Sequence, residues 1–239
     1  MRADGALGRG GESRGGLMEA RRIAIPIGEG RVSGLLLRPD DAKALYLFAH
    51  GAGVGMAHPS MEANARGFAE RGIATLRFQF PYMERGGGRP DPPRIAQPTV
   101  RAAAAAAVHL APDLPLFAGG RSYGGRMSSQ AQAAAPLAGV KGLVFLGFPL
   151  HPAGAPSAER AEHLERVEIP MLFVSGDRDA LADMSLLEPL VEGLGDRATL
   201  HVVKGGDHGL RVLASSGRTP ADAQAEALDA AAEWMTACV

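Results

Sequence analysis

Short apolar runs alternate with longer helical patterns along almost the whole chain. Runs of this kind separated by helical segments of about 10 to 18 residues indicate parallel strands joined by right-handed crossovers, with helices on both faces of one sheet. The expected strands are Arg22–Ile27, Ser33–Arg38, Ala44–Phe48, Ala74–Phe80, Leu116–Ala118, Gly142–Phe148, Met171–Ser175 and Thr199–Val203. The expected helices are Ser60–Arg71, Pro98–Leu110, Tyr123–Leu137, Leu181–Leu194 and Pro220–Ala237.

The first two strands are joined differently from the others. Gly28-Glu29-Gly30-Arg31 lies between them and predicts a hairpin, so the sheet starts antiparallel and continues parallel. The chain is therefore expected to be an α/β protein with a mixed, mostly parallel sheet of about eight strands. We expect one such domain over residues 18–239. Residues 1–17 are rich in glycine and are expected to form a flexible tail, with Met18 a possible start of translation.

Charge and cysteine content exclude several classes of protein. The 25 Lys and Arg residues are offset by 26 Asp and Glu residues, and a net charge of -1 gives no reason to expect a nucleic-acid partner. One cysteine excludes a disulfide framework. The longest apolar stretches, Ala102–Val108 and Gly142–Leu150, are far shorter than the roughly 18 residues of a membrane span. We expect a soluble, cytoplasmic protein without a membrane partner and without a cofactor; its oligomeric state stays open.

A candidate nucleophile stands in Gly120-Arg121-Ser122-Tyr123-Gly124, which fits G-x-S-x-G. With 32 glycines in the chain, about 0.2 chance matches are expected, so the motif alone is weak evidence. Its context is stronger, because an apolar strand precedes it and a helical segment follows, and a sharp strand-to-helix turn holds the nucleophile in such sites. The alternative is a glycine-rich turn in which Ser122 only caps a helix.

Two further groups stand at the ends of later strands. Asp179 follows Met171–Ser175, and His208 follows the strand that ends at Val203. The order Ser, Asp, His is the order of a triad built on this type of sheet, and the carboxyl ends of parallel strands meet at one edge. Asp177 is the alternative acid, although its side chain is also suited to shaping the turn.

The loop His50-Gly51-Ala52-Gly53 follows the strand Ala44–Phe48. Acyl transfer needs two backbone N–H groups directed at the developing oxyanion, one from the residue after the nucleophile and one from an early loop. We expect these donors to be Tyr123 and Ala52, with Gly53 the alternative to Ala52.

Together these segments, with Phe173–Asp179 and Gly205–His208, resemble the α/β-hydrolase superfamily. More narrowly, the chain resembles a small branch that includes dienelactone-hydrolase-like proteins and animal testis-expressed and chromatin-complex hydrolase-like proteins; Phe78–Met83 also fits that branch. The resemblance implies an α/β-hydrolase fold and favours Asp179 as the acid, three residues after Gly176. It departs from dienelactone hydrolases at Ser122, where those enzymes have a cysteine.

The expected activity is hydrolysis of a carboxylic ester with a small or medium acyl group, through an acyl-enzyme on Ser122. An amidase or peptidase and a non-catalytic interaction module are the alternatives. His151–Val167 offers only a short cap, which predicts a shallow, open cleft. A metal site at His50, His58 and His151 matches no ligand spacing and is not expected. The expected pocket walls are Met56, His58, Phe80, Tyr82, Met83 and Phe148.

Overall fold

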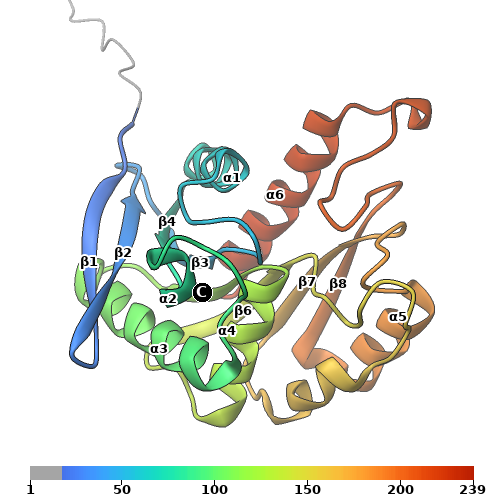
Figure 1. Cartoon of the computed structure of the whole chain (residues 1–239). Coiled ribbons are helices and arrows are strands. Elements are labelled where there is room, and N and C mark those ends of the chain that lie inside the picture. Colours follow the sequence, from blue (N-terminus) through green and yellow to red (C-terminus); the bar gives the residue numbers. More distant parts are fainter. Residues whose placement is uncertain (1–17) are drawn as a thin grey trace, which may run out of the picture.

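Eight strands form one mixed sheet in the computed structural model, which describes residues 18–239 (Figure 1). The strand order is β1-β2-β4-β3-β5-β6-β7-β8. The hairpin of β1 and β2 and the pair β2 and β4 are antiparallel, and all other pairs are parallel, so the predicted mixed sheet is confirmed. The tail predicted at residues 1–17 lies outside the described residues. The strands are β1 (Arg21–Ile27), β2 (Gly30–Leu37), β3 (Ala44–Ala49), β4 (Ile73–Phe78), β5 (Leu116–Arg121), β6 (Val140–Leu146), β7 (Met171–Gly176) and β8 (Ala198–Val203).

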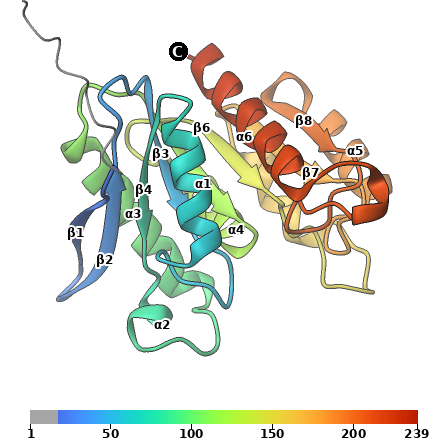
Figure 2. The ribbon, with the colours of Figure 1, turned by 90° about the horizontal axis from the view of Figure 1, so that it is seen from above.

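Helices cover both faces of the sheet, as the crossovers require. Helices α1 (Pro59–Ala69) and α6 (Pro220–Ala237) lie on one face, and Figure 2 shows both on the near side when the molecule is seen from above. Helices α3 (Pro93–Leu110), α4 (Tyr123–Ala134) and α5 (Met184–Gly193) pack on the other face (Figure 1). Short helical turns complete the structure: α2 (Pro81–Glu84), η1 (Glu159–Arg166), η2 (Gly195–Arg197) and η3 (Ala214–Ser216).

The alanine run of α3 packs directly on the sheet. Ala96, Ala103, Ala104 and Ala107 are buried in the core between this helix and the strands. Alanine has the highest helix propensity and its small side chain lets a helix lie close to a sheet. The run therefore serves packing.

Two predicted helix starts were wrong. Helix α3 begins at Pro93, not Pro98, because Pro98 removes only one helical N–H and the helix continues through it. Helix α5 begins at Met184 instead of Leu181, because the Asp183 carboxylate accepts the Ser185 N–H at 2.9 Å and caps the helix there. None of the helices within residues 18–239 is both long and apolar enough to span a bilayer.

Candidate active site

Ser122 lies at a sharp turn between β5 and α4. Its backbone has φ 47° and ψ −118°, a conformation that a non-glycine residue adopts only under strain. The flanking glycines make this turn possible. A Cβ on Gly120 would lie 2.2 Å from the Ala49 carbonyl oxygen, and a Cβ on Gly124 would lie 2.6 Å from the same oxygen. Both positions therefore exclude side chains because the end of β3 approaches so closely.

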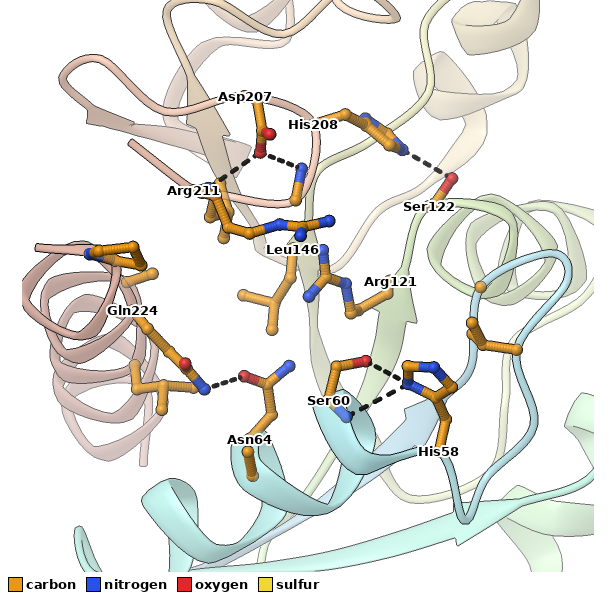
Figure 3. Close-up of a pocket in the computed structure, with 18 of the residues that line it drawn as sticks. His58, Ser60, Asn64, Arg121, Ser122, Leu146, Asp207, His208, Arg211 and Gln224 are labelled. Carbon is orange, nitrogen blue, oxygen red and sulfur yellow. Dashed lines mark hydrogen bonds between the residues drawn. The ribbon is translucent and has the colours of Figure 1, made fainter. Parts of the chain in front are cut away.

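Three polar side chains from separate strand ends meet beside this turn. The Ser122 Oγ lies 2.8 Å from His208 Nε2, and His208 Nδ1 lies 2.8 Å from Asp179 Oδ2 (Figure 3 shows the first contact). The Asp179 side chain is fully buried and also accepts the Leu181 N–H at 2.8 Å. A buried carboxylate at Nδ1 places the imidazole proton on that nitrogen, which leaves Nε2 free to accept the serine proton.

Asp177, the alternative acid, makes no hydrogen bond to His208 in the described part of the chain. Its Oδ1 accepts the Gly205 N–H at 2.6 Å and so links the turn after β7 to the turn after β8. These two turns touch, because a Cβ on Gly176 would lie 2.1 Å from the Gly206 carbonyl oxygen. Asp177 thus holds the loop that carries His208, whereas Asp179 contacts the imidazole itself.

The loop between β3 and α1 lies against the nucleophile and is held by buried side chains. A Cβ on Gly51 would lie 3.8 Å from the Ser122 Cβ. His50 is fully buried, its Nε2 accepts the Phe80 N–H at 3.1 Å, and its Nδ1 therefore donates to the Gly51 carbonyl at 2.9 Å. Burial lowers the pKa of His50 to about 4, so the ring stays neutral.

The far end of the same loop is also anchored. The buried Arg77 donates to the Met56 carbonyl at 3.0 Å, and the Met56 N–H donates to Gln79 Oε1 at 2.8 Å. Both anchoring side chains come from β4 or the residue just after it. The loop backbone that faces Ser122 is therefore fixed at both ends.

A cavity of about 690 Å³ opens beside Ser122 and His208. Its walls come from the β3–α1 loop, the first half of α1, the turns after β7 and β8, and the first half of α6 (Figure 3). Labelled side chains that line it include His58, Ser60, Asn64, Arg121, Leu146, Asp207, Arg211 and Gln224.

Most of the predicted pocket walls are wrong. His58 lines the cavity, but Met56, Phe80, Tyr82 and Phe148 are at most 7% exposed and belong to the core or its edge. Met83 is partly buried and packs against the core on the same side. The reason is packing among rings, since the Phe80 ring centroid lies 4.9 Å from that of His50 and 5.1 Å from that of Tyr123.

The loop Arg85–Pro93 holds aromatic residues that pack beside the active site. The buried Asp91 accepts the Tyr82 N–H and the Arg85 guanidinium, both at 2.8 Å. Its carbonyl accepts the Tyr123 hydroxyl at 2.7 Å. The walls of the cavity come from other segments, so this loop contacts them through Tyr82 and Tyr123.

His50 and His151, two of the three histidines considered above for a metal site, bond backbone groups through both ring nitrogens. His50 has the two backbone partners described above. His151 bonds the Pro152 carbonyl and the Asp183 N–H, at 2.9 and 3.0 Å. Within the part of the chain that the structure describes, no group of three or more His, Cys, Asp or Glu side chains is arranged to hold a metal ion.

Sequence reasoning missed the polar wall of the cavity. Arg121, Asn64 and Gln224 line the cavity but were not among the predicted pocket residues. One signal was present for Arg121, since the residue before a nucleophile at the end of a central strand lies at the mouth of the site.

A family model described as an α/β hydrolase domain matches residues 42–236. The chain belongs to this α/β-hydrolase family. The expected resemblance to α/β hydrolases, in the branch with little or no cap, is confirmed, and this membership supports hydrolase activity.

Solved structures share the fold over nearly the whole chain. A dienelactone hydrolase from Anabaena variabilis is 22% identical, with a TM-score of 0.73 over 92% of this chain and 97% of that one. Protein XC6422 from Xanthomonas campestris, described as an α/β serine hydrolase without a lid, is 22% identical, with a TM-score of 0.67 over 90% of this chain and 95% of that one. A cold-adapted esterase from an Arctic intertidal metagenomic library is 19% identical, with a TM-score of 0.65 over 98% and 100%.

Proposed function

We propose that this protein is a serine hydrolase that cleaves carboxylic esters of small or medium acyl groups through an acyl-enzyme on Ser122. The observation that carries the proposal is the continuous chain of hydrogen bonds from Ser122 Oγ through His208 to the buried Asp179. Membership of the α/β-hydrolase family supports the same reaction class.

In the first half of the reaction, Ser122 Oγ attacks the ester carbonyl while its proton passes to His208 Nε2. Asp179 stabilises the imidazolium that forms. The negative charge on the carbonyl oxygen is stabilised by the N–H groups of Ala52 and Tyr123, neither of which has a hydrogen-bond partner within residues 18–239. His208 then gives its proton to the leaving alkoxide, and the alcohol departs.

The second half repeats these steps with water. His208 Nε2 takes a proton from a water molecule, whose oxygen attacks the acyl carbonyl. The tetrahedral intermediate collapses, the Ser122 oxygen regains its proton from His208, and the carboxylic acid leaves. His208 is partly exposed, with 26% of its side chain accessible, so water can reach it.

A fluorophosphonate probe tests the nucleophile. We expect the wild type to be labelled and Ser122→Ala to be unlabelled. Ser129→Ala is a matched control, because Ser129 Oγ also lies 2.7 Å from a histidine, His163 Nε2, but both side chains are buried away from the cavity. A folded wild type that neither reacts with the probe nor cleaves short 4-nitrophenyl esters would favour a non-catalytic module.

The acid is tested by a matched pair of variants. Asp179→Asn is expected to lower kcat for a 4-nitrophenyl ester by about 10³- to 10⁴-fold, because the imidazole loses the partner that sets its tautomer. Asp177→Asn is expected to stay within about threefold of the wild type, because the amide oxygen of Asn can still accept the Gly205 N–H and hold the turn. The reverse ranking of the two variants would move the acid role to Asp177.

A further inference from the structure

Basic side chains dominate the charge of the cavity beside Ser122. Three arginines line it, Arg121, Arg178 and Arg211, against one carboxylate, Asp207. The Asp207 Oδ1 already accepts the N–H groups of Gly209 at 2.7 Å and of Arg211 at 2.9 Å. None of the salt bridges among residues 18–239 includes any of the three arginines. The cavity therefore holds excess positive charge.

Arg121 and Arg211 direct their guanidinium groups into the same part of the cavity, as Figure 3 shows. Arg121 is the last residue of β5, directly before the nucleophile, and is only partly exposed. Burial lowers the pKa of Arg121, and the charge of Arg211 lowers it further while Asp207 opposes this. A guanidinium stays charged under such shifts, so two like charges face each other on this side of the cavity. An anion between them would remove this repulsion.

Asn64 provides an independent observation on the opposite wall. The residue is 4% exposed, and its Oδ1 accepts the Gln224 Nε2–H at 2.8 Å. This bond fixes the orientation of the amide, and the Nδ2 group is buried without a hydrogen-bond partner. Figure 3 shows that Nδ2 points into the cavity, on the side of Arg121. A buried N–H donor without an acceptor is destabilising, and an anionic oxygen in the cavity would satisfy it.

We propose that the substrate is an ester that carries a second, anionic group, a carboxylate or a phosphate, bound in this cavity by Arg121, Arg211 and Asn64. The inference deepens the proposed ester hydrolysis and rests on it. Guanidinium groups bind carboxylate and phosphate oxygens through paired, charge-assisted hydrogen bonds, and the Asn64 amide adds a third donor. Ser122 lines the same cavity, so the scissile carbonyl and the anionic group belong to one small molecule.

Matched substrates test the selectivity. Mono(4-nitrophenyl) adipate carries a free carboxylate, and its methyl ester is the neutral counterpart; Ser122→Ala gives the spontaneous background. We expect the wild type to show at least tenfold higher kcat/KM for the charged ester. Arg121→Gln should lower that ratio about 10- to 100-fold, the range for a lost hydrogen bond to a charged group. Arg31→Gln removes the same charge from the exposed end of the β1–β2 hairpin and should leave the ratio unchanged.

Arg211→Gln provides a second variant, because Arg211 is exposed and its replacement does not disturb the turn of the nucleophile. Arg211→Gln should also lower the ratio of kcat/KM for the charged ester to kcat/KM for the neutral ester. A wild type that prefers the neutral ester, or a folded Arg121→Gln and Arg211→Gln that both keep the wild-type ratio, would overturn the proposal.

Binding to Ser122→Ala separates this inference from the catalytic one. Calorimetric titration with adipate and with inorganic phosphate is expected to show binding of at least one anion, which Arg121→Gln in the same background weakens. Tighter binding of phosphate than of adipate would assign the site to phosphate-bearing esters, and the reverse to carboxylates. Failure of both anions to bind would overturn the anion site. Anion binding by a protein that cleaves no ester would leave the anion site standing and refute ester hydrolysis.

Discussion

Acidification should destabilise this protein through two buried histidines before its carboxylates protonate. His50 and His163 are at most 8% exposed, and burial lowers the pKa of each from 6.5 to about 4; Arg166 and Arg126 add to the shift at His163. Between pH 6.5 and about pH 4, these two histidines bind protons in the unfolded chain but not in the folded chain. Stability is therefore fully present above about pH 6.5 and is lost as the pH falls toward 4.

The magnitude follows from the size of the shift. One pKa unit corresponds to about 1.4 kcal/mol, so at pH 5 each ring lowers the free energy of unfolding by roughly 2 kcal/mol relative to pH 8, and the two together by roughly 4 kcal/mol. For His50 the structure supplies the reason. Its Nε2 accepts the Phe80 N–H, and a proton on Nε2 would break that bond.

Urea unfolding at pH 8, 7, 6 and 5, followed by the fluorescence of the partly buried Trp234, measures this effect. His50→Gln should lose about 2 kcal/mol less than the wild type between pH 8 and pH 5, and His163→Gln should behave alike. His109→Gln is the control, because His109 is exposed on α3. Curves for the wild type and both buried-histidine variants that run parallel to one another would refute the conclusion that these rings are neutral in the folded protein.

Two substitutions test contacts that hold the active site together. Gly176→Ala should lower the free energy of unfolding by about 3 kcal/mol or more, because the new Cβ would lie 2.1 Å from the Gly206 carbonyl oxygen and the backbone must move. A loss below about 1 kcal/mol in urea unfolding would contradict that contact. Tyr123→Phe should lower the free energy of unfolding by about 1 to 2 kcal/mol, because the buried Asp91 carbonyl loses the hydroxyl that donates to it at 2.7 Å. An unchanged unfolding midpoint would show that this hydrogen bond contributes nothing to stability.

The positions of Ser122, Asp179 and His208 just past the ends of predicted parallel strands predicted that they lie together, and the reason is geometric. Parallel strands expose their carboxyl ends at one edge, so residues just past β5, β7 and β8 come together whatever the loops contain. The start of α5 depended instead on local capping by Asp183. Whether Pro98 starts a helix or lies within one is decided by packing, which the local sequence does not report.

The positions of the strand ends could not predict the side of the sheet on which a side chain lies. That side decides which residues line the cavity. The aromatic residues past β4 pack edge-to-face against Tyr123, with the Tyr82 and Tyr123 centroids 6.3 Å apart, and fill the space on that side of the nucleophile. The burial of these rings against one another leaves the open side of the nucleophile to α1 and α6, whose first halves contribute Asn64 and Gln224. An apolar acyl chain would therefore find its expected walls already occupied, whereas a polar or charged chain would find unpaired donors. The proposed preference for an anionic substrate thus follows from which side of Ser122 the core has already filled.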